Sequence, residues 1–208
     1  MLPSRTLIAA ALLSCLGSAY GADQTETRQL ARFTEIRIKA PVDMTYTVGP
    51  TASLQVSASA EMLSQLVLSV SNGELTIDAK SGSDFHHGVR VVATGPLLTG
   101  VSIDGAGNFK ATGLTGAAFN TRIAGAGSIS ATGAVHHINA SVKGAGDIDL
   151  KKLTAKDAVI TIAGTGSVKA YASESVAVTV NGVGSVDISG KPAKRDVTTH
   201  GIGSVSFD

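Results

Sequence analysis

A short phrase, Gly-x-Gly, recurs six times in the C-terminal half of the chain, and it constrains the fold more than any other feature. The triplets occupy residues 105–107, 125–127, 144–146, 164–166, 182–184 and 201–203. The steps between their first glycines are 20, 19, 20, 18 and 19 residues. A period near 19 is too short for a helical-hairpin repeat or a propeller blade, and it fits one coil of a β-solenoid.

Alternating apolar residues flank every triplet. In the first copy Val101 and Ile103 precede the glycines, and Phe109 and Ala111 follow them. This period of two predicts a strand, a bend and a second strand in each repeat. Stacking the repeats in register would create two apolar columns. The first column would be Ile103, Ile123, Val142, Ile162, Val180 and Thr199, and the second Phe109, Ile129, Ile148, Val168, Val186 and Val205. Because each fully buried side chain of this size contributes roughly 1.5–3 kcal/mol, the columns predict a substantial core.

The glycines predict a tight corner, since a residue without Cβ allows close backbone approach and positive φ. The residue between them is Ala, Ala, Ala, Thr, Val or Ile and is never charged, so we expect it to face the interior. A phosphate-binding loop would need a helix after the glycines, whereas a predicted strand follows each triplet. The sequence therefore disfavours a nucleotide site.

The first 21 residues are typical of a secretory signal peptide. Arg5 supplies the basic start, residues 7–16 are largely apolar, and Ala19-Tyr20-Gly21 is a small-x-small cleavage site. We expect export to the periplasm or the cell surface, with a mature chain that begins near Ala22 and contains no transmembrane segment. The alternative is a lipoprotein signal with Cys15 lipidated, to which the surrounding leucines fit poorly.

The charge balance argues against nucleic acid as a partner. The chain has 17 Lys and Arg against 16 Asp and Glu, and loss of Arg5 with the signal leaves 16 of each. A neutral protein has no general attraction for polyanions. Cys15 is the only cysteine, so the mature chain carries no disulfide framework.

We expect one β-solenoid domain over residues 33–208, preceded by a flexible leader over residues 22–32. Residues 33–100 alternate less regularly and contain no Gly-x-Gly, which predicts irregular coils before the repeats of residues 101–208. Residues 60–66 have weak helical character. The polar segment from Ser81 to Gly88 is the clearest surface loop, and loops of this kind are where a binding site would lie.

No residue set indicates a catalytic, cofactor-binding or metal site. Histidines occur as His86-His87 and His136-His137, with His200 alone, and neighbours on a strand point to opposite faces. When the repeats are stacked, the residues that align with Asp104 in the other copies include no second carboxylate. A glycosidase needs a pair of carboxyl groups, so this alignment argues against one. We therefore predict that the protein is not an enzyme.

Several segments together resemble the GIN domain family, whose members are described as head domains of autotransporter adhesins. These segments are residues 33–38 (FTEIRI), 41–44 (PVDM), 73–77 (GELTI) and the repeated G-x-G-[ST]-[IV] units. The resemblance covers residues 33–208. It implies a right-handed parallel β-helix in exported bacterial proteins whose function is largely uncharacterised, and it brings no catalytic residues.

The leading hypothesis is a non-catalytic exported β-solenoid that acts as an envelope or surface interaction module, with an adhesive role. Its partner would be an envelope protein or a polysaccharide. One alternative is a carbohydrate-active β-helix enzyme, either a polysaccharide lyase or a glycosidase. Another is a scaffold that self-associates through the exposed solenoid end, because unpaired strands there can accept a further strand.

Overall fold

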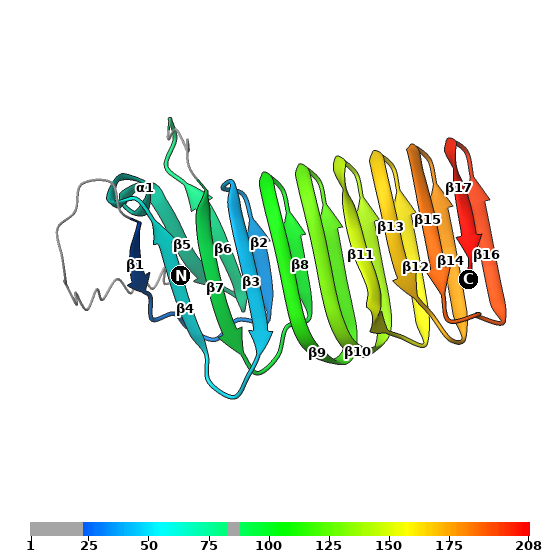
Figure 1. The fold of residues 1–208 in the computed structure, drawn as a ribbon, viewed down its shortest axis with the longest axis horizontal. Coiled ribbons are helices and arrows are strands. Elements are labelled where there is room, and N and C mark those ends of the chain that lie inside the picture. The colour runs from blue at the N-terminus through cyan, green and yellow to red at the C-terminus, as the bar shows by residue number, and fades with distance from the viewer. Residues whose placement is uncertain (1–22, 83–87) are drawn as a thin grey trace, which may run out of the picture.

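The computed structural model describes residues 23–82 and 88–208, which are almost entirely strands wound into one elongated stack (Figure 1). One helix, α1 (Ala60–Gln65), interrupts them. The strands are β1 (Gln24–Thr27), β2 (Glu35–Ile38), β3 (Val42–Val48), β4 (Ser53–Ala58), β5 (Leu66–Ser71), β6 (Glu74–Ala79), β7 (Val89–Gly95), β8 (Gly100–Ile103), β9 (Ala106–Ile123), β10 (Ala126–Val142), β11 (Ala145–Thr154), β12 (Asp157–Ile162), β13 (Thr165–Tyr171), β14 (Ser175–Val180), β15 (Val183–Ser189), β16 (Lys194–Thr199) and β17 (Ile202–Phe207).

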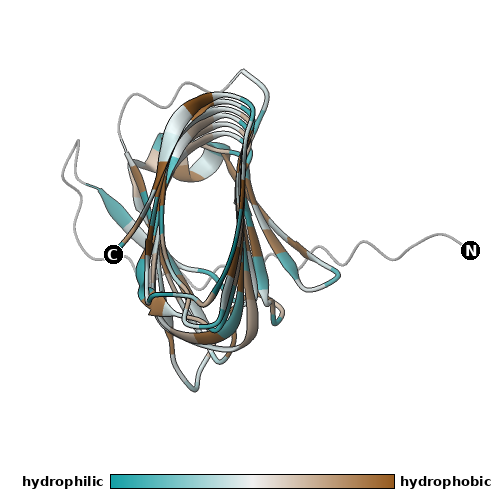
Figure 2. Cartoon of the chain, turned by 90° about the vertical axis from the view of Figure 1, so that its right-hand side faces the viewer, coloured by the Kyte–Doolittle hydropathy of each residue, from teal (hydrophilic) through white to brown (hydrophobic). Residues whose placement is uncertain are grey.

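The strands form two sheets that enclose the core, and the chain alternates between them (Figure 2). The first sheet runs in the order β5, β6, β2, β8, the second half of β9, the second half of β10, β12, β14 and β16. The second sheet runs β1, β4, β7, β3, the first halves of β9 and β10, β11, β13, β15 and β17. The fold is thus an all-β solenoid, as the repeat predicts.

The two predicted columns are confirmed residue by residue. In the first sheet Ile103 pairs with Ile123, and the register continues to Thr199. In the second sheet Phe109 pairs with Ile129, and that register continues to Val205. All members except Thr199 and Val205, in the last coil, are buried.

Each Gly-x-Gly triplet forms the corner between the two sheets. The N–H of the middle residue donates to the carbonyl oxygen of the first glycine one coil earlier, as from Ala126 to Gly105 at 2.9 Å. Four further bonds of 2.9 Å repeat this at the later corners, with Ala145, Thr165, Val183 and Ile202 as donors. A Cβ on Gly125 would overlap the carbonyl oxygen of Gly105 and lie 2.6 Å from that of Asp104. The corners therefore stack too closely for any side chain on these glycines.

The middle residue of the triplet points outward, so the expectation that it faces the interior is wrong. Ala106 and Ala126 are exposed, Val183 is 49% exposed and Ile202 is 76% exposed. The reason is the alternation itself: counting in steps of two from the buried Ile103 reaches the two glycines and then the buried Phe109. The glycines therefore occupy the inward positions, where the corner leaves no space.

Residues before the first triplet follow the solenoid with two changes. The coil of β2 and β3 lies between the β6–β7 coil and the β8–β9 coil, although it precedes both in sequence. In addition, β4 and β5 run antiparallel to β7 and β6. The β5–β6 hairpin closes at Asn72 and Gly73, both at positive φ, which is the turn that favours antiparallel pairing. The irregular coils expected over residues 33–100 thus include antiparallel strands.

The N-terminal end of the stack is covered. Helix α1, with Ser59 as its N-cap, buries Met62 and Leu63 against the core. Strand β1 lies within the segment expected to be a flexible leader, and it pairs antiparallel with β4. The signal segment, Cys15 and residues 83–87 of the predicted loop lie outside the described residues.

Replacing a corner glycine tests this packing. We expect Gly125→Ala to lower the free energy of unfolding by about 3 kcal/mol or more, because the new methyl group collides with backbone that the neighbouring coils fix. Gly49→Ala is the matched control, since a Cβ there meets nothing within 4 Å, and it should change stability by less than about 0.5 kcal/mol. Equal denaturant midpoints for the two variants would contradict the close-packed corner.

Tyr46 predicts how stability changes in alkali. Its ring is fully buried between Ala93 and Ala111, its hydroxyl donates to the carbonyl oxygen of Leu97 at 3.2 Å, and burial raises its pKa to about 12. In the unfolded chain a tyrosine has a pKa near 10. Between pH 10 and 12 the Tyr46 hydroxyl ionises in the unfolded chain but keeps its proton in the folded protein. The free energy of unfolding therefore falls by about 2–3 kcal/mol over this range.

Urea titrations at pH 8 to 12 measure this loss. Tyr46→Phe should remove most of the alkaline decline, at a cost of about 1 kcal/mol at neutral pH for the lost hydrogen bond. Tyr171→Phe is the control. Tyr171 is partly exposed, so this substitution should leave the alkaline decline unchanged. The same alkaline decline in Tyr46→Phe and the parent protein would show that another group causes it.

Candidate functional site

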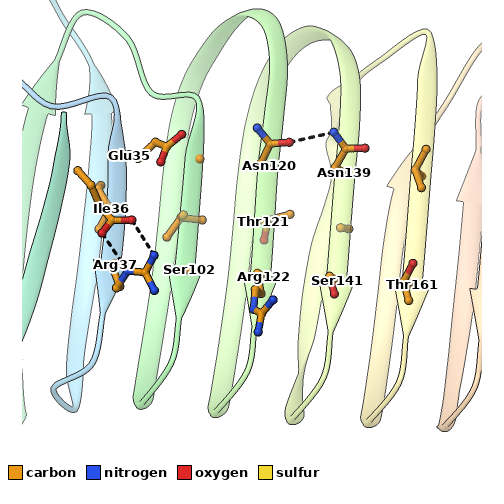
Figure 3. Close-up of a pocket in the computed structure, with 15 residues that line it drawn as sticks. Glu35, Ile36, Arg37, Ser102, Asn120, Thr121, Arg122, Asn139, Ser141 and Thr161 are labelled. Atoms are coloured by element: carbon orange, nitrogen blue, oxygen red, sulfur yellow. Dashed lines mark hydrogen bonds and ion pairs between the residues drawn. The ribbon is translucent and has the colours of Figure 1, made fainter. Parts of the chain in front are cut away.

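A shallow groove of about 290 Å³ crosses the outer surface of the first sheet (Figure 3). It runs over five neighbouring strands, from β2 across β8, β9 and β10 to β12, and its edge includes Glu74 on β6. Because these strands belong to successive coils, the groove follows the long axis of the molecule. Its length therefore depends on the stacking and not on any one loop.

At β8 the outward residues of the groove are small, namely Gly100 and Ser102. Their register partners are Glu35 and Arg37 on β2 and Asn120 and Arg122 on β9. The small residues thus lie between two strands that carry long polar side chains. The result is a depression whose walls are the polar side chains of β2 and β9 and whose floor is the backbone of β8.

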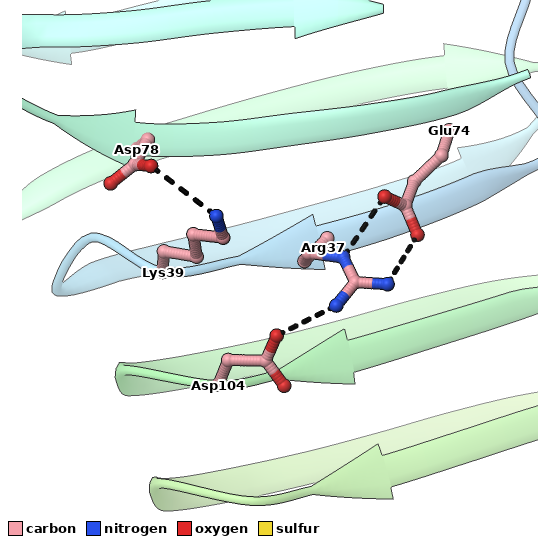
Figure 4. Close-up of polar contacts among 5 residues, drawn as sticks. All are labelled: Arg37, Lys39, Glu74, Asp78 and Asp104. Atoms are coloured by element: carbon pink, nitrogen blue, oxygen red, sulfur yellow. Dashed lines mark hydrogen bonds and ion pairs between the residues drawn. The ribbon is translucent and has the colours of Figure 1, made fainter. Parts of the chain in front are cut away.

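Arg37 is fixed at one end of the groove by two carboxylates (Figure 4). Its Nε and Nη2 donate to the two oxygens of Glu74 at 2.9 and 3.0 Å, and its Nη1 donates to Asp104 at 2.9 Å. The hydrogen bonds with Glu74, followed by those with Asp104, raise the pKa of Arg37 above its usual range. A bidentate guanidinium of this kind is held rigidly, so it defines the shape of this wall.

Two asparagines form the middle of the groove. Asn139 Nδ2 donates to Asn120 Oδ1 at 2.9 Å, and Asn120 Nδ2 donates to the backbone carbonyl of Thr99 at 3.4 Å (Figure 3). Each amide is thereby oriented by its neighbour one coil away. In the adjacent row, Arg122 is followed by Ser141 and Thr161 toward the C-terminal end.

Arg122 differs from Arg37 because no acidic side chain among the described residues lies within ion-pairing distance of it. Its register partners on both sides are serines, Ser102 and Ser141. Lys143 follows Ser141 by two residues on the neighbouring coil, is also exposed and likewise has no ion pair among the described residues. The groove therefore contains one neutralised cation, Arg37, and one available cation, Arg122, with Lys143 outside its lining on the same sheet surface.

The second sheet carries a polar row of a different kind beside the corners. Asn108 Nδ2 donates to Asp43 at 2.8 Å, Ser128 Oγ to Asn108 at 2.7 Å, and Ser167 Oγ to Asp147 at 2.6 Å. These side chains bond to the next coil and support the stack. They do not surround a hollow among the described residues.

Catalytic arrangements are not evident in residues 23–82 and 88–208. His137 Nδ1 lies 3.1 Å from Asp157, but Ser175 donates to Asp157 at 2.5 Å and does not contact His137, so a Ser-His-Asp relay is not formed. Glu74 and Asp104 both accept hydrogen bonds from Arg37, so these carboxylates are engaged in an ion pair and do not face each other as a glycosidase pair.

The histidines and the predicted surface loop are not part of the groove lining. His136 and His137 have their ring centroids 6.4 Å apart with nearly perpendicular planes, and His200 is exposed in the last corner. His86 and His87 lie outside the described residues. No three His, Cys, Asp or Glu side chains come together as a metal site in the described part of the chain.

Sequence reasoning missed the groove because it depends on β2 lying beside β8. Arg37 and Glu74 enter the groove from strands that precede the repeats. One available signal was the shared alternation of EIRI at residues 35–38 and GVSI at residues 100–103, which end in the paired Ile38 and Ile103.

Comparison with known families shows that the chain belongs to the family described as "Putative auto-transporter adhesin, head GIN domain", which matches residues 32–192. The resemblance drawn from the sequence is thus confirmed. The chain matches no curated protein at a significant level. No described helix has the length and apolar character needed to cross a membrane.

Solved structures support the fold at low sequence identity. A "putative adhesin" from Bacteroides fragilis NCTC 9343 aligns with a TM-score of 0.75 and 20% identity over 90% of this chain and 98% of that chain. A "putative adhesin" from Parabacteroides merdae ATCC 43184 aligns with a TM-score of 0.56 and 16% identity over 89% and 97%. A "Putative lipid binding protein" from Parabacteroides distasonis ATCC 8503 gives 0.50 and 18% over 89% and 97%. At these identities the likeness concerns the fold alone.

The C-terminal end of the stack is a second exposed surface. Strand β16 is exposed along its whole length, and β16 and β17 each pair on one side (Figure 1). Arg195 continues the inward column of the buried Val176, and its guanidinium lies 4.4 Å from the centroid of the Phe207 ring. A charged side chain directed inward at a sheet edge discourages the addition of a further strand.

Arg195→Leu tests whether this side chain limits self-association. We expect the variant to show a sedimentation coefficient that rises with protein concentration more steeply than that of the parent, because the end of the core loses its charged cover. Lys194→Leu places the same apolar group at the neighbouring, outward-facing position and should have a smaller effect. Identical concentration dependence for the parent and Arg195→Leu would show that Arg195 has no protective role.

Proposed function

We propose that this protein is a non-catalytic, exported adhesin-type module that binds an extended glycan in the groove of the first sheet. The observation that carries the proposal is the set of fixed polar side chains along that groove: Arg37 held by Glu74 and Asp104, and Asn120 held by Asn139. The membership of the chain in an adhesin family supports a role in surface recognition.

The chemistry of the groove favours a sugar ligand. The strands beneath it already use their backbone groups to pair with neighbouring coils, so recognition falls to side chains. Amides, guanidinium groups, carboxylates and hydroxyls are the groups that hydrogen-bond to sugar hydroxyls. They recur at the strand spacing of about 4.8 Å, a length comparable to one sugar ring, so a chain of sugars can meet several coils in turn.

A lipid or an apolar peptide fits this surface less well. Ile36 and Val101 lie below the groove and are only 1% and 4% exposed. Among the residues that line the groove, Val159 is the large apolar side chain that remains accessible. Binding sites for apolar ligands are lined predominantly by hydrophobic and aromatic side chains. Ten of the fifteen residues that line this groove carry polar or charged side chains, and none of the fifteen is aromatic.

The proposal excludes turnover. Glu74 and Asp104 are engaged by Arg37, and the serine nearest a histidine–aspartate pair bonds to the aspartate instead of the histidine. Oligosaccharides recovered after incubation with the protein should therefore keep their length. Shortened products that a groove variant no longer forms would favour the lyase or glycosidase alternative.

A glycan array of bacterial and host oligosaccharides, followed by NMR titration of the strongest hit, tests the binding proposal. We expect chemical-shift changes concentrated on β8, β9 and β10, and an affinity about tenfold lower for Asn139→Ala, which removes the partner of Asn120. Asn108→Ala is the matched control, because it removes a similar cross-coil hydrogen bond on the second sheet. Loss of binding in the control but not in Asn139→Ala, or no binding to any glycan, would overturn the proposal.

A further inference from the structure

We propose that the groove selects an acidic glycan and holds its carboxylate between Arg122 and Lys143. This inference rests on the proposed glycan-binding function and names the ligand class for the same site. It is carried by the distribution of paired and unpaired charges along the first sheet.

The pairing of Arg37 at the end of the groove leaves Arg122 as the unpaired cation at its centre. Arg37 is neutralised by Glu74 and Asp104, and Lys39 lies 3.6 Å from Asp78. Arg122 and Lys143 have no acidic partner within ion-pairing distance among the described residues. The two cations therefore face solvent with their charge available.

The backbone brings these cations together. Arg122 pairs in register with Ser141 on β10, and Lys143 lies two residues beyond Ser141 on the same outward side, at the start of the corner. The N–H of Lys143 donates to the carbonyl oxygen of Ile123 at 2.8 Å, which fixes this corner to the coil of Arg122. Arg122 and Lys143 are thus diagonal neighbours in the register of one sheet surface.

The surroundings of Arg122 leave space for a ligand group. Ser102 and Ser141 flank it on the neighbouring strands, and Gly100 adds no side chain to the floor. A planar guanidinium binds a carboxylate through two parallel hydrogen bonds, and Lys143 adds a point charge beside it. A uronate-type sugar supplies a carboxylate on the ring together with hydroxyls for Asn120 and Asn139.

Acidic residues at the other end of the groove set the direction of the ligand. Glu35 is in register with Glu74, and no ion pair among the described residues neutralises Glu35. An anionic group is repelled there and attracted to Arg122, two strands away from Glu35. The neutral sugars of the chain would then lie over β2 and β8, or continue toward Thr161.

Isothermal titration with matched oligosaccharides tests the inference in the folded chain. The probes are oligomers of galacturonate, of mannuronate and of the glucuronate-containing hyaluronan unit, each beside its carboxyl-reduced counterpart with the same linkages. We expect at least one acidic oligomer to bind about tenfold or more tightly than its reduced form, with an affinity that falls as NaCl increases.

Charge-removing variants locate the site. Arg122→Gln should weaken binding of the acidic oligomer about tenfold and leave binding of the reduced form unchanged, while Lys143→Gln should cause a smaller loss. Lys110→Gln removes an exposed lysine from the second sheet and is the matched control. Unchanged thermal unfolding of all three variants would establish that the losses concern binding.

The outcomes separate this inference from the function on which it rests. Equal binding of acidic and reduced oligomers, lost in Asn139→Ala, would overturn the carboxylate inference and keep the glycan-binding groove. Acidic binding that survives Arg122→Gln or is lost in Lys110→Gln would overturn the assignment to Arg122. Preference for a sulfated neutral oligomer over the uronates would overturn the carboxylate as the recognised group. No binding of any oligomer, acidic or neutral, would overturn both proposals.

Discussion

The hydrogen bond from the middle residue of each corner to the first glycine of the preceding corner is the contact on which the solenoid depends. It links Ala126 to Gly105, and the same bond recurs at the later corners. The bond is possible because the glycines allow neighbouring backbones to approach more closely than any side chain permits. Once the corners are fixed in this way, the strands of both sheets pair in one register. Apolar residues then stack over apolar residues on the inner face of each sheet.

This single register also determines what the outer surface can do. Every outward side chain lies beside its equivalents from neighbouring coils, so the surface consists of rows and not of converging loops. The Asn120–Asn139 pair and the isolated Arg122 are members of two adjacent rows on the first sheet. A surface built this way suits an extended, repeating ligand, and its backbone groups are already committed to the stack. Recognition by a row of polar side chains is the function that such an architecture supports most directly.

The sequence predicted the repetitive part of the fold in detail, because a period near 19 and an alternation of two leave one consistent register. The same alternation, continued through the triplet from Ile103, would have placed the middle residue outward, and assuming that uncharged means buried led to the opposite assignment. Before Gly100 the sequence predicted strands but not their partners. The antiparallel hairpin follows from Asn72 and Gly73, whereas the insertion of β2 beside β8 depends on packing between segments distant in the chain. The groove arises at that contact and therefore had no local signature.

Scalar couplings across hydrogen bonds, measured by NMR between an amide nitrogen and the carbonyl carbon that accepts from it, test the stacked corner most directly. The structure predicts couplings from Ala126 to Gly105, from Ala145 to Gly125, and onward with one link for each corner to Ile202 and Gly182. Detection of this series would establish both the register and the closeness of the glycine backbones. Couplings that connect these amides to other residues, or their absence while the neighbouring strand amides show theirs, would contradict the stacked corner and the surface built on it.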